Sequence, residues 1–233
     1  MPALTTVQRR AHYDDFVAQV IDQCTENSIR ADLASGRGRP WAECDRMQPH
    51  LIRLIAGYGA RRAHSTIACL IAMQRRLTDD SPYPPESASD DPSADADGTA
   101  RPSSTAVDTA TAAPTHEGAP PGNPAAKEAT PGLLWRKRPN LGASLAIAVV
   151  RHGFDEERMT ERLKALTKLP SELLHPRLWS LASYLRNQGA ARLDFAVLLE
   201  DLAWWDNDQP EIATRWRESY FPTIDHLRLS EEH

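Results

Sequence analysis

The stretch Asn140–Leu166, NLGASLAIAVVRHGFDEERMTERLKAL, decides the fold class. Asn140 is a favourable helix N-cap, and the helix that follows is expected to end at Gly153. Asp155 predicts the start of a second helix, because two glutamates follow in the first turn, where the helix dipole favours negative charge. Apolar residues of this second helix recur at the spacing of one buried face: Met159, Leu163 and Leu166. The stretch therefore indicates an α-helical protein.

The same signals continue downstream of this stretch. Pro176 predicts a helix start, followed by leucines at helical spacing as far as Gly189. Asp194 is expected to cap a helix over 195–205. A last helix is predicted to open at Asp208 and Pro210.

The residues upstream also follow a helical pattern. Helices are expected from Thr5 or Thr6, near 28–35, from Pro49, and over 60–77. The first carries an apolar stripe of Tyr13, Phe16, Val17, Val20, Ile21 and Cys24. No segment alternates apolar and polar residues as a half-buried strand does. The predicted fold class is therefore all-α, with two small helical bundles.

The segment 78–132 separates the two predicted bundles and differs from both in composition. It holds ten of the 18 prolines, and its only large apolar residues are Tyr83 and Val107. Such a segment cannot bury enough surface to offset its chain entropy, so we expect a disordered linker, acidic and rich in proline and alanine. The predicted domains are an N-terminal bundle over 1–77 and a C-terminal bundle over 133–228.

Charge is segregated along the chain in the same blocks. The net charge of −5 is the sum of +4 over 1–77, −8 over 78–132, +6 over 133–193 and −7 over 194–233. Because local fields decide whether a polyanion can bind, the two basic blocks are compatible with nucleic-acid binding despite the acidic total.

Catalytic and metal-binding signatures are not evident in the sequence. The glycine-rich stretch Gly36–Pro40 lacks the glycine and lysine spacing of nucleotide-binding loops, so it predicts an arginine-bearing turn instead. The paired carboxylates Glu200 and Asp201 are interpreted as part of a solvated helix face. Three widely spaced cysteines indicate reduced, mostly buried thiols. We therefore expect no catalytic residues, no cofactor and no metal.

Basic side chains are the stronger signal. Arg158 and Arg162 are four residues apart and share a helix face, and Arg151 lies one helix earlier. Further basic residues follow or precede them in the same block: Arg136, Lys137, Arg138, Lys168, Arg177, Arg186 and Arg192. Each alone is most simply a solvated or ion-paired surface side chain. Together they favour contact with phosphates that does not depend on base sequence. The tryptophans are expected mainly in the core.

The order of several motifs resembles the CasB family, the small subunit of the type I-E CRISPR-associated Cascade complex, in its actinobacterial form. Residues Arg30–Pro40, RADLASGRGRP, are similar to that family's Arg-x-x-Leu-x-x-Gly-x-Gly-Arg/Lys-Pro turn. The matches cover roughly 28–77 and 141–221. The remaining motifs begin at Gly142, Arg151, Asp155, Arg162, His175, Leu193, Trp205 and Arg215.

The resemblance implies a non-catalytic, cytoplasmic subunit that contacts the guide RNA, the target DNA and the displaced strand through their phosphates. It also implies two further kinds of partner, other Cascade subunits and a second copy of this chain, and no membrane. By matching position, the implied nucleic-acid contacts are Arg37, Arg39, Arg151, Arg158, Arg162 and Arg177.

Two alternatives stay open from the residues. One is a helical protein–protein adaptor whose arginines bind acidic partners, and the other is a small hydrolase. The segment 78–132 also departs from the family, which usually joins its halves by a short loop. Its net charge of −8 suggests competition with nucleic acid for the basic faces.

Overall fold

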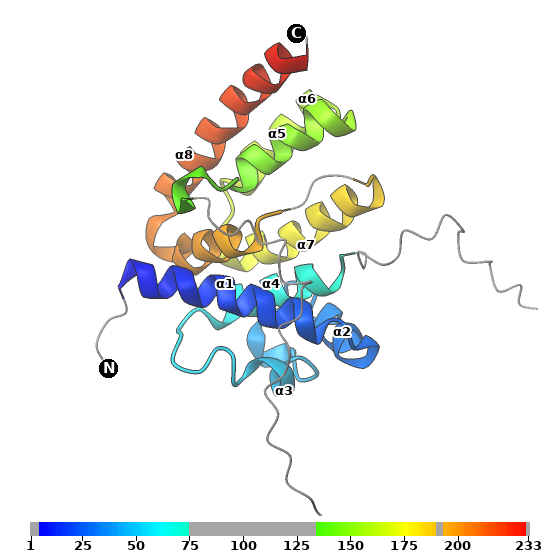
Figure 1. Ribbon diagram of the computed structural model, residues 1–233, viewed down its shortest axis with the longest axis vertical. Coiled ribbons are helices and arrows are strands. Elements are labelled where there is room, and N and C mark those ends of the chain that lie inside the picture. The colour runs from blue at the N-terminus through cyan, green and yellow to red at the C-terminus, as the bar shows by residue number, and fades with distance from the viewer. Residues whose placement is uncertain (1–4, 75–133, 190–192, 232–233) are drawn as a thin grey trace, which may run out of the picture. The chain divides into compact units, whose positions relative to one another are not determined.

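The computed structural model describes residues 5–74, 134–189 and 193–231, and these are helical with no strand. This confirms the all-α prediction, while the expected linker and the boundaries at 77 and 133 lie outside the described residues. The elements, in chain order, are α1 (Thr6–Gln23), α2 (Asn27–Ala34), η1 (Trp41–Glu43), α3 (Gln48–Leu51), α4 (Arg61–Ala72), η3 (Trp135–Lys137), α5 (Leu141–His152), α6 (Glu156–Leu166), α7 (Ser171–Asn187) and α8 (Phe195–Glu231) (Figure 1).

The predicted helix caps are present. Asn140 accepts a hydrogen bond from the Ala143 amide at the start of α5, which ends at Gly153. Asp155 accepts one from the Arg158 amide at the start of α6. At the N-terminus, Thr5 forms a reciprocal capping box with Gln8. These caps satisfy amides that have no partner inside the helix, which is why they mark helix starts in the sequence.

Pro176 does not begin a helix, so that prediction is wrong. Helix α7 starts at Ser171, and Pro176 lies inside it. A proline there cannot donate to the carbonyl four residues earlier, which belongs to Glu172. The Arg62 guanidinium donates to this carbonyl instead, at 2.9 Å. A long-range contact thus compensates the proline, and no local pattern reveals it.

Helix α8 is interrupted where a new helix was expected. Asp208 has non-helical angles, φ −142° and ψ 29°, so α8 consists of two helical halves. Pro210 follows in the first turn of the second half. The prediction of a helix opening at Asp208 and Pro210 is confirmed by this break.

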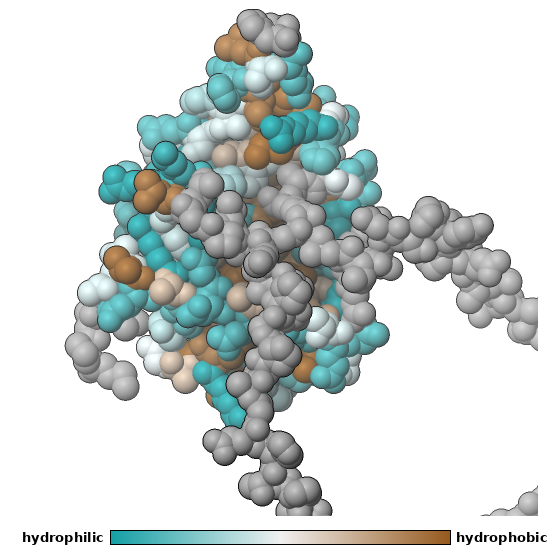
Figure 2. Space-filling view, in the orientation of Figure 1, coloured by the Kyte–Doolittle hydropathy of each residue, from teal (hydrophilic) through white to brown (hydrophobic). Residues whose placement is uncertain are grey.

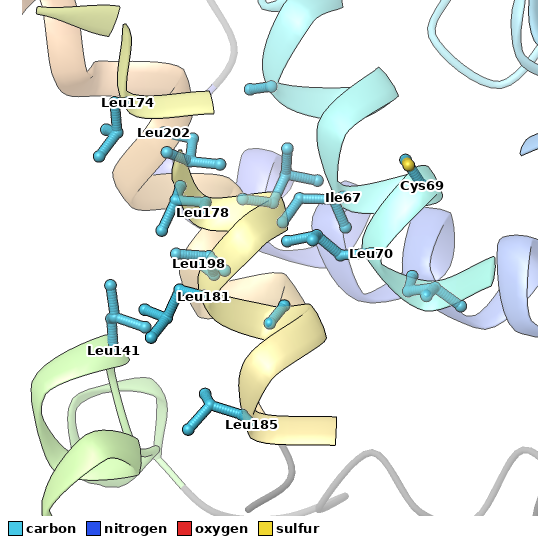
Figure 3. Packing of buried hydrophobic residues seen from close by; sticks show 14 of the residues in the cluster. Ile67, Cys69, Leu70, Leu141, Leu174, Leu178, Leu181, Leu185, Leu198 and Leu202 are labelled. Atoms are coloured by element: carbon cyan, nitrogen blue, oxygen red, sulfur yellow. The ribbon is translucent and has the colours of Figure 1, made fainter. Parts of the chain in front are cut away.

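Helix α7 lies between α4 on one side and α5 with α6 on the other (Figure 1). Its buried leucines face a cluster that includes residues from both the early and the late helices (Figure 3). These leucines are Leu174, Leu178, Leu181 and Leu185. The described residues therefore share one hydrophobic core.

Helices α5 and α8 approach each other closely at Gly142. A Cβ atom built on Gly142 would lie 1.8 Å from the Trp216 carbonyl oxygen, so no side chain fits there. Trp205 and Trp216 are buried beside this contact, as expected for tryptophans of the core, whereas Trp204 is 38% exposed and Trp135 and Trp179 are only partly buried. In α1, by contrast, Ile21 is 41% exposed, so the predicted apolar stripe is shorter than expected.

None of the described helices has the length and apolar character that a membrane span requires.

Candidate nucleic-acid interface

The turn Gly36–Pro40 packs directly on the backbone of α7. A Cβ atom on Gly38 would lie 2.6 Å from the His175 carbonyl oxygen, and its φ of +72° is one that glycine adopts readily. The neighbouring Arg37 also has a positive φ, 47°. The close approach that Gly38 permits is thus to α7, within the protein.

The two arginines of this turn are exposed but differently held. Arg39 donates to the carbonyls of Ser35 at 3.0 Å and Gly36 at 3.3 Å, at the end of α2. The Arg37 guanidinium lies 5.7 Å from the centre of the Trp179 ring on α7. Its backbone amide donates to Cys69 Sγ at 3.1 Å. Burial raises the pKa of the Cys69 thiol to about 11, so the thiol stays protonated.

Arg158 and Arg162 lie on the exposed face of α6, one turn apart. The Arg162 guanidinium stacks 3.9 Å from the centre of the Tyr184 ring on α7. Within the described residues, the side chains of Arg151, Arg158 and Arg177 are exposed and form no hydrogen bond or ion pair. The Glu161 carboxylate, which is placed by helical spacing near Arg158, forms no ion pair in this part of the chain.

The six arginines do not gather at one point. Trp179 and Tyr184 are five residues apart on α7, which separates them by about 140° around the helix axis. Arg37, with Arg39, therefore lies on one flank of α7, and Arg162, with Arg158, on the other. Tyr184 and Trp179 support these guanidiniums, and nothing in the local sequence pairs either ring with its arginine.

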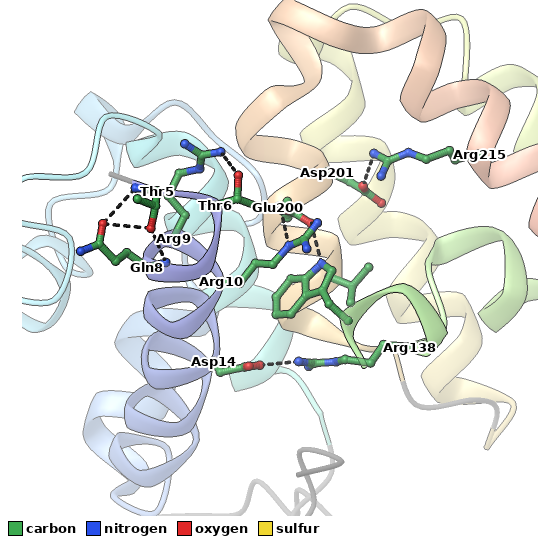
Figure 4. A network of polar contacts seen from close by, with 12 residues as sticks. Thr5, Thr6, Gln8, Arg9, Arg10, Asp14, Arg138, Glu200, Asp201 and Arg215 are labelled. Atoms are coloured by element: carbon green, nitrogen blue, oxygen red, sulfur yellow. Dashed lines mark hydrogen bonds and ion pairs between the residues drawn. The ribbon is translucent and has the colours of Figure 1, made fainter. Parts of the chain in front are cut away.

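Several other basic residues serve the fold. Arg138 has a side chain only 6% exposed and donates to both carboxylate oxygens of Asp194 at 2.7 Å. It also donates to Asp14 at 2.6 Å (Figure 4). Arg30 donates to the Ala72 carbonyl at 2.8 Å, and Arg186 to that of Met73 at 2.6 Å. Their positive charge is therefore committed to internal contacts. Arg192 lies outside the described residues.

Glu200 and Asp201 are buried, so their interpretation as a solvated face is wrong. Glu200 accepts from Arg10 at 2.9 Å and from the Trp135 indole at 2.5 Å (Figure 4). Asp201 accepts from the Trp216 indole at 2.7 Å and from Arg215 at 2.9 Å. Burial raises the pKa of Asp201 to about 6 despite these two donors. The partners come from distant segments, which is why helical spacing misplaced both carboxylates.

The buried His64 and His175 and the half-buried His12 are also held by protein partners. His175 lies 2.8 Å from the Thr66 hydroxyl, and burial lowers its pKa to about 4. His12 and His64 are joined through their Nε2 atoms at 3.0 Å. Burial, with the charge of His64, lowers the pKa of His12 to about 4. Within the described residues, no three His, Cys, Asp or Glu side chains are grouped to hold a metal ion.

Similar folds are found among solved structures. A chain of a structure titled "CRISPR RNA-guided surveillance complex, pre-nicking" has a TM-score of 0.67 and 22% identity, covering 95% of this chain and 98% of that one. A second, titled "CRISPR RNA-guided surveillance complex", has a TM-score of 0.65 and 21% identity, covering 96% and 99%. CasB from Thermus thermophilus has a TM-score of 0.52 and 18% identity, covering 91% and 97%.

A search of curated proteins by sequence found no match. The family model for CRISPR-associated protein Cse2 matches residues 29–221, which is most of the chain. This range contains the Arg30–Pro40 turn and all six arginines, and it confirms the resemblance carried by the motifs. The chain belongs to the family of the CRISPR-associated protein Cse2.

Proposed function

We propose that this protein is the non-catalytic small subunit of a type I-E Cascade complex and binds nucleic acid through phosphate contacts. The observation that carries the proposal is the Cse2 family match over residues 29–221. The shared fold with chains of CRISPR RNA-guided surveillance complexes supports it. In this role the protein stabilises the guide RNA–target DNA region and the displaced strand, while base pairing reads the sequence.

The state of the exposed arginines supports phosphate contact. A guanidinium carries its five N–H donors in the plane of the group, at its edges. Stacking of Arg162 on Tyr184 occupies one face and leaves edge donors for a phosphate. The same holds for Arg37 beside Trp179. A ring that restrains the side chain reduces the entropy cost of binding, so these two arginines are good anchors.

The non-catalytic part of the proposal has its own support. The groups with strongly shifted pKa values, such as Asp201 and His175, are buried and held by Trp216 and Thr66. They therefore have structural roles in the described part of the chain. The expected partners are guide RNA, target DNA, other Cascade subunits and a second copy of this chain, in the cytoplasm.

Charge reversal on α6 tests the proposal. In R158E/R162E, we expect affinity for single-stranded DNA to fall at least tenfold at low salt, because each change removes a cation that binds a phosphate. The slope of log K against log[salt] should also fall, by about 0.7 for each phosphate that the variant no longer neutralises. The control is R53E, which reverses a single exposed arginine on the loop after α3.

The assembly of the complex separates this function from the adaptor alternative. Abolished DNA binding with intact Cascade assembly supports the proposal. Failed assembly with unchanged DNA binding would instead favour a protein–protein adaptor with acidic partners. Turnover of any nucleic acid that depends on a divalent metal would contradict the non-catalytic role and favour a hydrolase.

A further inference from the structure

A hollow of about 390 Å³ lies between the end of α6 and the second half of α8, apart from the six arginines. Three basic residues line it: Lys164 and Lys168 from α6 and the turn after it, and Arg217 from α8. Thr167, Thr214 and Gln209 add hydroxyl and amide groups to the lining. Among the described residues, no acidic side chain lines it. Its volume falls at the lower end of the range of about 300–1,000 Å³ for small-ligand pockets.

Hydrogen bonds across the two elements fix the shape of this hollow. The Gln209 amide donates to the carbonyls of Thr167 at 3.1 Å and Leu169 at 3.3 Å. The Trp205 indole, one turn before the kink, also donates to the Leu169 carbonyl, at 3.0 Å. The end of α6 is therefore tied to the kink of α8 on both sides of Asp208, and the walls do not depend on a ligand.

The basic side chains are arranged as an anion site. Lys164, in the last turn of α6, and Lys168, in the turn that follows the helix, both line the hollow, where their like charges repel each other. The Arg217 guanidinium is held by bonds to the Ala213 carbonyl and the Thr214 hydroxyl oxygen, both at 3.2 Å. The hydroxyl of Thr214 accepts from Arg217, so its own hydrogen is available to a ligand oxygen.

Acidic residues near the kink of α8 do not neutralise this hollow. Asp208 and Glu211 line a separate hollow of about 220 Å³, together with Arg10 and Arg215. From the kink onward, Arg217 thus lines one hollow, whereas Asp208, Glu211 and Arg215 line the other. The positive site combines Lys164 and Lys168, from the block with a net charge of +6, with Arg217, from the block with a net charge of −7.

We propose that Lys164, Lys168 and Arg217 form a binding site for a phosphate group. Three cations with a neighbouring hydroxyl donor suit a ligand that is anionic and offers several acceptor oxygens. Such a group is supplied by the backbone of a nucleic-acid strand or by free phosphate. The first source rests on the proposed function. It adds a contact that the family motifs do not specify, because Lys164 stands at a variable position of the motif that begins at Arg162, Lys168 lies between motifs, and Arg217 follows the last motif.

Titration with inorganic phosphate tests the site by itself. We expect the backbone amide signals of Thr167, Lys168 and Thr214 to shift in the NMR spectrum of the full chain. In K168E/R217E the shifts should disappear, while R53E, in which one exposed charge elsewhere is reversed, should keep them. R217K retains the charge and should bind within a few-fold of wild type, whereas R217Q should bind about tenfold more weakly. Unchanged shifts in K168E/R217E would overturn the proposal, as would their absence in wild type.

A single-stranded oligonucleotide distinguishes the two sources of phosphate. If the ligand is a nucleic-acid strand, K168E/R217E should lower the salt slope by about 1.4, which is about 0.7 for each of the two substituted cations. An unchanged slope with abolished phosphate binding assigns the site to free phosphate and overturns the nucleic-acid source. If wild type binds phosphate here but binds no oligonucleotide, the proposed function fails while this site stands. Thermal melting of each variant checks that it is folded, and K168Q/R217Q replaces K168E/R217E if the latter is not.

Discussion

Gly38 is the residue of the candidate interface that tolerates least change. In Gly38→Ala, the new Cβ would lie 2.6 Å from the His175 carbonyl oxygen, against a backbone that cannot move without shifting α7. The positive φ of 72° adds strain for alanine. We expect the free energy of unfolding to fall by about 2–4 kcal/mol, measured by urea denaturation.

Gly57→Ala is the matched control for this change. Gly57 has a φ of +86° but no atom within 4 Å of the position of its Cβ. Alanine there carries the backbone strain without the clash, so a loss of about 1 kcal/mol is expected. Equal losses in the two variants would show that the turn does not depend on close packing against α7.

At the scale of single residues, hydrogen bonds between near neighbours in sequence were predictable, and those between distant segments were not. Asn140 and Asp155 cap amides three residues away, so the sequence itself shows both partners. Glu200 is bound by Arg10 and Trp135, which lie 190 and 65 residues away. A carboxylate beside leucines on a helix looks solvated until those partners are known.

The short helix η3 is followed by a buried arginine with two ion pairs. Arg138 follows it directly and joins Asp14, on α1, with Asp194, which caps the start of α8. Arg138→Ala leaves the carboxylate of Asp194, which is 9% exposed, without its guanidinium. We expect unfolding to become easier by about 3 kcal/mol in chemical denaturation, because a buried charge is left without its partner.

Arg46→Ala removes an ion pair that is exposed to solvent. Arg46 and Asp32 are 2.5 Å apart, but the arginine side chain is 67% exposed. Solvent screens such a pair, so a loss below about 1 kcal/mol is expected. A loss as large as that of Arg138→Ala would contradict the distinction between the two pairs.

Helix existence was predictable at the scale of elements, and helix boundaries depended on tertiary contacts. The break of α8 at Asp208 was signalled by Asp208 and Pro210 themselves. Pro176 gave a false start signal, because Arg62 supplies the donor that the proline lacks. In α7 the contact that compensates the proline comes from far along the chain, since Arg62 lies 110 residues from Glu172.

At the scale of the whole molecule, the sequence predicted the charges but not their grouping. The six arginines follow from the motifs, yet the placement of Arg37 and Arg162 on two flanks of α7 depends on Trp179 and Tyr184. On the face shown in Figure 2, hydrophobic residues form small patches separated by hydrophilic ones. The described residues that are visible there form no broad apolar patch of the kind that marks many stable protein interfaces.

The acidic segment 78–132 is expected to weaken nonspecific DNA binding. Its net charge of −8 opposes the +4 and +6 of the blocks on either side. An anionic segment in the same chain has a high effective concentration, so it competes with phosphates for the basic side chains. In a variant with its aspartates and glutamates changed to asparagine and glutamine, we expect tighter nonspecific DNA binding at low salt.

Two variants distinguish the charge of segment 78–132 from its length as the cause of weaker DNA binding. The neutralised segment keeps its length, while deletion of 82–130 removes both length and charge. Tighter binding in both variants, with a steeper salt slope, identifies charge competition, because released phosphate-binding side chains displace more counterions. Tighter binding in the deletion alone would identify an effect of length. Unchanged affinity and slope in both variants would contradict competition, and the acidic segment would then have no influence on how the arginines of α6 and the Gly36–Pro40 turn meet nucleic acid.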